Sequence, residues 1–268
     1  MESQNLDSFS DETKAKVFMI TENSLVWVDI STLTLRNYEA PRPCMFLDFA
    51  PLSDGRVLIN GAMEIDTSYK THSMFLFSDH KLTVKREHEI GLVSLSMIPI
   101  ENTVYLIGAK KSQRYELSEN RSYDMEEMIS THVNGRSCRY NNDVLVVGGV
   151  NSYEVELYNT QGNYWAHVMT LSFPVYDISC IQVTKEKVLV ISAQECYLLD
   201  VEQGKLKQVE GLPIQLHGGV RHHVPIKQKD FVYTFVGSKE RALLRYSISK
   251  DSWTVLARYR EHSCCSLL

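Results

Sequence analysis

The strongest constraint on the fold is a short, strand-forming segment that recurs along the 268-residue chain. Aligned on their first apolar residue, its copies begin at Val17, Val57, Val104, Val144, Val188 and Phe231. The intervals between them are 40, 47, 40, 44 and 43 residues. Repeats of about 40–50 residues are typical of propeller blades that contain four strands. Six such units account for nearly the whole chain.

Each repeat also has a regular internal pattern. A polar turn precedes the anchor, as at 141–143, and an alternating strand such as 153–158 follows it before a second polar turn at 159–163. Short polar turns between apolar runs indicate hairpins, and alternation with period two indicates half-buried strands. The chain has 25 Val but only 9 Ala, and β-branched residues favour strands whereas Ala favours helices. We therefore expect four strands per repeat, named a to d from the hub outward.

Glycines and aromatic residues recur at fixed spacing in the best-kept repeats. The fourth and sixth repeats both show this spacing: Gly148-Gly149, Tyr158 and Trp165, then Gly237, Tyr246 and Trp253. The pattern resembles the kelch-repeat family, whose units carry a double glycine, a spaced Tyr and a spaced Trp. Other repeats keep less of it: Gly61, Phe77 and Val84 in the second, Gly108 in the third, and only the period in the first and fifth. The resemblance covers about residues 15–268.

These patterns predict an all-β protein. We expect a six-bladed β-propeller of the kelch type over residues 14–268, with four antiparallel strands per blade. Residues 1–13 are acidic and polar, and we expect them to form a flexible leader.

Closure of the ring is expected to involve the C-terminus. The first repeat starts at its b strand, so its innermost strand a is missing. Residues 261–268 resemble the a segments elsewhere, with Ser263-Cys264 matching Ser137-Cys138 and Ser179-Cys180. We expect this segment to close the first blade, since closure removes unpaired strand edges. Deleting 261–268 should then open the ring and cause aggregation, which size-exclusion chromatography and thermal melting would reveal.

The same residues allow a different interpretation. Cys265-Ser-Leu-Leu268 fits a weak C-terminal prenylation box, although no polybasic stretch precedes it. Mass spectrometry of the native C-terminus decides between the two. The N-terminus has no signal-peptide pattern, no apolar run reaches transmembrane length, and the six cysteines form no C-x-x-C pair. We expect reduced thiols and a cytoplasmic location, free or cytoskeleton-associated, without membrane attachment.

Charge and motifs point away from several function classes. The chain has 28 Lys and Arg against 33 Asp and Glu, a net charge of -5, which disfavours nucleic-acid binding. No motif of a phosphate loop, nucleophile elbow or zinc protease occurs. His222-His223 would point to opposite faces of a strand, and the neighbours Glu126-Glu127 do not converge on one point. We expect no catalytic residue, metal or cofactor.

One face of the predicted ring suits a protein partner. The b–c and d–a connections on this face are longer and less polar than the a–b and c–d turns opposite. They carry aromatic residues and arginines, which are enriched at interface hot spots. The candidate partner-binding residues are Arg42, Tyr69, Arg136, Tyr176 and Arg221. Kelch propellers hold protein partners on such a face, so the resemblance implies the same use.

The sequence thus predicts a non-enzymatic interaction module or a scaffold subunit of a larger assembly. One alternative is a substrate-recognition partner in a ubiquitin-ligase assembly. Another is a sugar epimerase or oxidase with a site at the channel mouth. The enzyme alternative requires three or more ionisable groups within contact distance on the inner strands.

Overall fold

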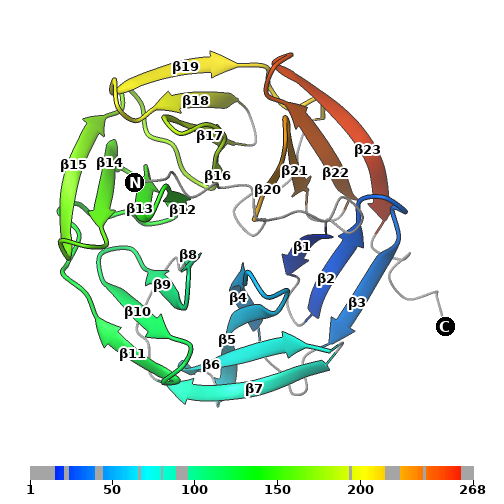
Figure 1. Ribbon diagram of the computed structural model, residues 1–268, viewed down its shortest axis with the longest axis vertical. Helices are drawn as coiled ribbons and strands as arrows, with labels where there is room; N and C mark the ends of the chain where they lie inside the picture. The colour runs from blue at the N-terminus through cyan, green and yellow to red at the C-terminus, as the bar shows by residue number, and fades with distance from the viewer. Residues whose placement is uncertain are drawn as a thin grey trace, which may run out of the picture.

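The chain folds into antiparallel sheets arranged around a central axis (Figure 1). The computed structural model describes residues 16–20, 24–39, 45–65, 68–79, 81–88, 96–192, 195–214, 224–237 and 240–260. Among these residues there is no helix, and hence none that could cross a membrane. Five sheets have four strands and one has three. The prediction of an all-β propeller with four-stranded blades is confirmed, but five complete blades are found where six were expected.

The strands follow one another from the hub outward in each sheet. The first sheet comprises β1 (Lys16–Ile20), β2 (Ser24–Asp29) and β3 (Leu35–Glu39). Blade 2 comprises β4 (Met45–Pro51), β5 (Val57–Ile65), β6 (Ser68–Ser78) and β7 (Lys81–His88). Blade 3 comprises β8 (Ser96–Ile100), β9 (Thr103–Ile107), β10 (Ser112–Glu116) and β11 (Arg121–Asp124). All six anchor residues lie on the predicted b strands, as Val17 does on β1 and Val57 on β5.

Blades 4 to 6 repeat the arrangement. Blade 4 comprises β12 (Arg136–Tyr140), β13 (Asp143–Val147), β14 (Glu154–Asn159) and β15 (Tyr164–Thr170). Blade 5 comprises β16 (Ser179–Gln182), β17 (Lys187–Ile191), β18 (Cys196–Asp200) and β19 (Lys205–Val209). Blade 6 comprises β20 (Ile226–Gln228), β21 (Phe231–Val236), β22 (Glu240–Ser247) and β23 (Ser252–Arg260). Within each blade the sequence runs inside to outside, and Figure 1 shows the last blade returning beside the first sheet.

Apolar side chains fill the space between neighbouring sheets. Where blade 6 meets the first sheet, Phe235 and Tyr233 pack with Val26 and Val28. This contact closes the ring by side-chain packing. Similar buried clusters join each of the other neighbouring pairs of sheets. The core is therefore distributed around the ring, one layer between each pair of sheets.

The repeated aromatic residues occupy equivalent places. Tyr158 and Trp165 contact each other at a ring-centroid distance of 5.1 Å, and Tyr246 and Trp253 do so at 4.9 Å. Each indole donates a hydrogen bond to a main-chain carbonyl just after the outer strand of the preceding blade, Glu126 for Trp165 and Glu210 for Trp253, both at 2.9 Å. The Tyr and Trp of the repeat therefore join adjacent blades.

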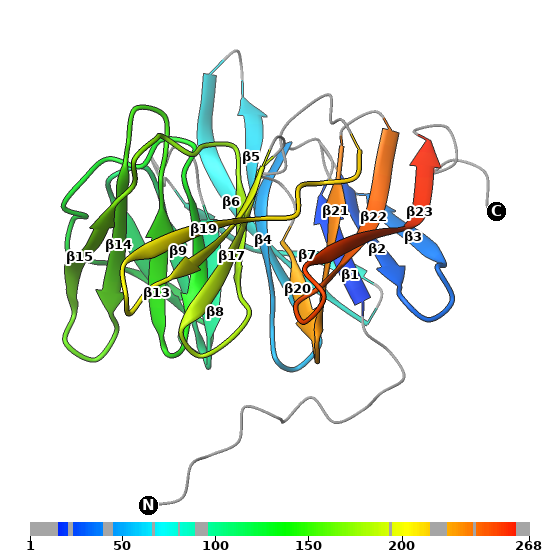
Figure 2. The same ribbon diagram turned by 90° about the horizontal axis from the view of Figure 1, so that it is seen from above.

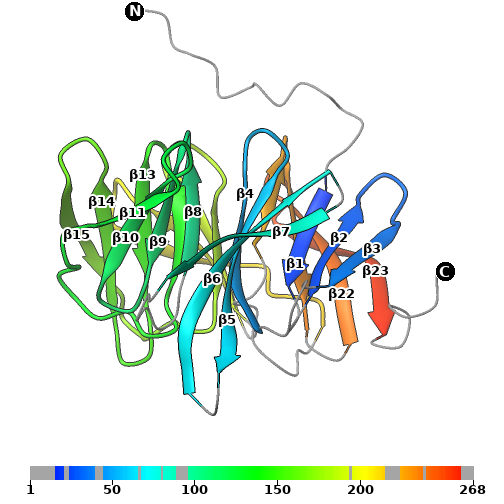
Figure 3. The same cartoon turned by 90° about the horizontal axis from the view of Figure 1, so that it is seen from below.

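The b–c hairpin of blade 2 is longer than those of the other blades. β5 and β6 continue as a ladder as far as Ile65 and Ser68, so the hairpin projects beyond the ring (Figures 2 and 3). The expected C-terminal strand, 261–268, and the leader, 1–13, lie outside the described residues. Because β23 reaches Arg260, only two residues precede Ser263, whereas the fully described d–a connections, 125–135 and 171–178, are longer. The predicted match of Ser263 leaves a short connection, and the pairing of this segment stays a prediction.

Candidate functional site

Three loops on the b–c and d–a face of blade 4 form one continuous surface. They are residues 125–135, 148–153 and 171–178, which we call the blade-4 platform. Main-chain hydrogen bonds join them: Val150 donates to Val133 at 2.6 Å, Gly149 to Val175 at 2.7 Å and Asp177 to Asn134 at 3.0 Å. Because the bonds link every pair of loops, the platform is held as a unit.

The double glycine of the repeat makes this close approach possible. Gly148 and Gly149 have φ of +62° and +139°, in the region that side chains disfavour. A Cβ on Gly148 would collide with the Val175 carbonyl oxygen, and one on Gly149 would lie 3.0 Å from the His132 backbone. The two glycines therefore allow both outer loops to approach the b–c loop closely.

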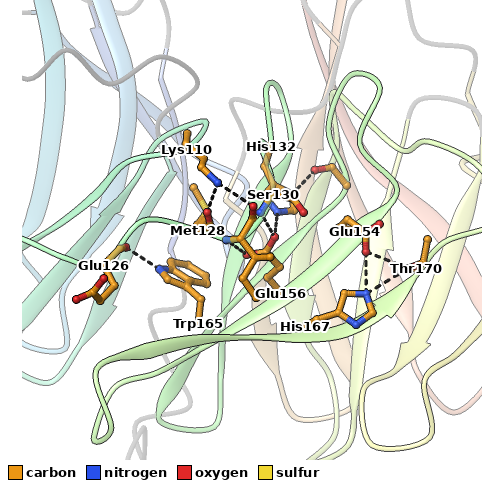
Figure 4. Close-up of polar contacts among 12 residues, drawn as sticks. Lys110, Glu126, Met128, Ser130, His132, Glu154, Glu156, Trp165, His167 and Thr170 are labelled. Atoms are coloured by element: carbon orange, nitrogen blue, oxygen red, sulfur yellow. Dashed lines mark hydrogen bonds and ion pairs between the residues drawn. The ribbon is translucent and has the colours of Figure 1, made fainter.

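A buried carboxylate anchors the first loop from below. Glu156 on β14 is fully buried and accepts hydrogen bonds from the amides of Ile129 at 2.9 Å and Ser130 at 2.6 Å (Figure 4). Its Oε1 lies 3.1 Å from Nε2 of buried His132, whose Nδ1 lies 2.6 Å from the Gly148 carbonyl oxygen. Burial acts to raise the pKa of Glu156, but these hydrogen bonds outweigh it, so the pKa lies below its usual value of 4.5.

The position of the c strand between two blades explains why this carboxylate is buried. Val155 packs against blade 5 and Tyr158 against blade 3, so neighbouring blades cover both faces of β14. Glu156 lies two residues before Tyr158 and therefore shares its face of the strand. At the same position before the c-strand aromatic residue, blades 2 and 6 have buried Phe75 and Leu244, so Glu156 replaces an apolar core residue. An alignment of the repeats on Tyr158 identifies this position.

Polar contacts also fix the outer edges of the platform. The ammonium group of Lys110 donates to the main-chain carbonyls of Met128 and Ile129, so it supports the first loop (Figure 4). At the other edge, Glu154 Oε2 lies 2.7 Å from His167 Nε2 and accepts a hydrogen bond from Thr170 at 3.0 Å. These partly exposed contacts lie at the two edges of the platform.

The platform presents apolar side chains to solvent. Ile129, Val150, Tyr153 and Tyr176 are 56%, 39%, 42% and 52% exposed. They make up four of the seven large apolar side chains that are exposed in the described part of the chain. The others are scattered: Leu33 and Tyr164 lie at c–d turns and Val84 lies on an outer strand. A rigid loop surface with several exposed aromatic and aliphatic side chains is typical of a protein contact site.

The five candidate residues fall in different surroundings. Tyr176 lies on the platform. Tyr69 belongs to the projecting β6 hairpin, where nothing of its side chain is described, and Arg42 and Arg221 lie outside the described residues. Arg136 is 7% exposed at the start of β12. Of the five, therefore, the described structure places only Tyr176 at an exposed position on the predicted face.

Arg136 belongs to a buried contact among the inner strands of blades 2 to 4. Its guanidinium donates to Oδ1 of fully buried Asp48 on β4 at 2.7 Å, and the amide of Met97 on β8 donates to Oδ2 at 2.7 Å. Burial raises the pKa of Asp48, although the guanidinium opposes that change. Arg136 was expected among the partner-binding residues, and the sequence could not show this pairing because Asp48 lies 88 residues away.

Among the described residues of the inner strands, Asp48 and Arg136 form an ion pair. No group of three or more His, Cys, Asp or Glu among the described residues is placed to hold a metal ion. His222-His223 lies outside the described residues.

Comparison with known proteins identifies the fold alone. No family model matches the sequence, and no curated protein matches it. Among solved structures, that of YjhT resembles the chain with a TM-score of 0.53 at 12% sequence identity. The resemblance covers 63% of this chain and 66% of the YjhT chain. At this identity the likeness concerns the fold and carries no function.

Proposed function

We propose that the chain is a non-enzymatic interaction module of the kelch type that binds a protein partner through the blade-4 platform. The observation that carries this proposal is the set of four exposed apolar side chains on three hydrogen-bonded loops. Ordered loops lose little conformational entropy on binding, and aromatic side chains bury much area for few rotatable bonds. The propeller thus supplies a scaffold, and the loops supply the contact.

The kelch assignment and the sixth blade belong to this proposal. The kelch type is supported by the equivalent Tyr–Trp contacts of blades 4 and 6 and by the glycine pair beneath the platform. A sixth complete blade requires one further strand beside β1. We propose a cytoplasmic setting, where a module of this kind would act as a subunit of a larger assembly.

A matched pair of variants tests the proposal. Tyr153→Ser with Tyr176→Ser removes two aromatic side chains from the platform. Tyr164→Ser removes one from a c–d turn on the opposite face, where Tyr164 is 53% exposed, close to the 52% of Tyr176. All three positions are exposed, so the fold should tolerate the changes.

The measurement is quantitative affinity purification from the native cell extract with the wild type and both variants. We expect a partner that copurifies with the wild type and with Tyr164→Ser but is reduced at least tenfold with the platform variant. Equal recovery of every partner with all three proteins would contradict the use of this surface.

A further inference from the structure

The charges around the platform are predominantly negative. Its three loops contain Glu126, Glu127 and Asp177 but no Lys or Arg. Glu126 and Glu127 are exposed. The contact between Glu126 and Trp165 uses the main-chain carbonyl of Glu126 and leaves its carboxylate out.

Among the described residues, the two neighbouring b–c turns add little positive charge. Lys110 already binds two carbonyl groups beneath the first loop, which leaves exposed Lys111 as the cation of the adjacent blade-3 turn. On the opposite side, exposed Glu195 accepts a hydrogen bond from Tyr197, whose ring contacts Phe173 of the platform at 5.1 Å. Carboxylates therefore lie on both sides of the apolar centre.

We propose that the platform binds a partner segment in which apolar side chains are flanked by Lys or Arg, an inference that rests on the proposed function. The apolar side chains would cover Ile129 and Val150. Lysine or arginine side chains would pair with Glu126 and Glu127 and pack over the rings of Tyr153 and Tyr176, since aromatic faces attract cations. An acidic segment would meet like charges.

Three labelled synthetic peptides of 14 residues probe this selectivity by fluorescence anisotropy with the full chain. One combines Leu with Lys, one Leu with Glu, and one Ser with Lys. We expect the Leu–Lys peptide to bind at least tenfold more tightly than either of the others. The Ser–Lys peptide measures attraction by charge alone, and the Leu–Glu peptide measures apolar contact opposed by like charges.

Two charge-reversal variants locate the binding. Glu126→Lys with Glu127→Lys should weaken binding of the Leu–Lys peptide about tenfold, as expected for reversal of two rim charges. Glu119→Lys with Glu202→Lys makes the same change in net charge at exposed c–d turns on the opposite face and should leave binding unchanged. An equal effect of both pairs would overturn the inference, because the attraction would then depend on net charge alone.

Other outcomes separate the inference from the proposed function. If the Leu–Glu peptide binds as tightly as the Leu–Lys peptide and loses affinity in Tyr153→Ser with Tyr176→Ser, the charge preference is wrong while the platform remains a binding surface. If no peptide binds but the platform variant loses its cellular partner, the inference again fails and the function stands. If partner recovery is also unchanged, both fail.

Discussion

At the scale of single residues, the turns between c and d strands show how backbone conformation selects side chains. Each of the six turns contains one residue with positive φ: Leu33, Asp79, Asn120, Asn163, Gly204 and Asp251. Asn, Asp and Gly tolerate this conformation, whereas Leu is strained in it. In three of the turns the residue also accepts a hydrogen bond from the c-strand tyrosine, Tyr115, Tyr158 or Tyr246. Leu33 is therefore the residue that departs from the rule.

Replacing Leu33 with Gly should stabilise the protein. Leu33 has φ of +55° and an exposed side chain, so relief of strain outweighs the small loss of contact. We expect a gain of about 1 kcal/mol in unfolding free energy, or about 2 °C in the midpoint of thermal unfolding. Leu33→Ala, which keeps a Cβ, is the control and should give no gain. A lower midpoint for Leu33→Gly would show that the side chain stabilises the turn.

Sequence spacing identified two of these three c-strand tyrosines. Tyr158 and Tyr246 follow their glycines by nine residues, so spacing identified them. Tyr115 follows Gly108 by only seven, so the pattern missed it. The tyrosine-to-turn hydrogen bond, five residues long in all three cases, is the better signal, because no loop of variable length intervenes.

At the scale of elements, the platform depends on β14, whose buried Glu156 carboxylate accepts hydrogen bonds from the loop at 125–135. Sequence reasoning predicted which face carries the longer, less polar connections, since hairpin geometry assigns turns to faces. It did not predict how the loops join, because hydrogen bonds between residues such as Gly149 and Val175 follow no local pattern. It also missed Glu156, since the pattern indicated a half-buried strand, whereas neighbouring blades cover both faces of β14.

Replacing Glu156 with Gln should destabilise the protein in a pH-dependent manner. At pH 7 we expect a loss of about 2 kcal/mol, because hydrogen bonds to a buried carboxylate become weaker. The pKa of Glu156 is lower in the folded protein than its usual 4.5, so its contribution is present above pH 4.5 and is lost as the pH falls toward the lowered pKa. The difference from wild type should therefore shrink below pH 4.5.

Urea unfolding between pH 7 and pH 3.5 measures this difference. Glu154→Gln is the matched control on the same strand, where a partly exposed ion pair contributes about 1 kcal/mol at most. A wild-type advantage over Glu156→Gln that stays constant across this range would rule out the assigned role of the carboxylate.

At the scale of the whole molecule, the ring is held by contacts between residues far apart in the sequence. The repeat period predicted the number of sheets and the position of every b strand, because the spacing of anchors is a property of the sequence alone. Contacts between the inner strands of different blades were not predictable. Asp48 and Arg136 belong to the inner strands of blades 2 and 4, and their pairing depends on how the blades are arranged around the ring.

A double-mutant cycle tests whether this ion pair couples the blades. Asp48→Asn and Arg136→Met should each cost about 3–5 kcal/mol, because each leaves a buried polar partner without its counterpart. The double variant should cost less than the sum of the two by about 1–3 kcal/mol. Strictly additive losses in urea unfolding would mean that the two side chains stabilise the hub independently.

The most direct test of the account is site-specific photo-crosslinking in the native cell extract. The photoreactive residue p-benzoylphenylalanine replaces Tyr176 on the platform in one protein and Tyr164 on the opposite face in another. Because the two positions are equally exposed, both crosslinkers have equal access to solvent. We predict one protein adduct that forms from position 176 and not from position 164. An adduct that forms from position 164 alone would contradict the claim that the blade-4 platform binds the partner.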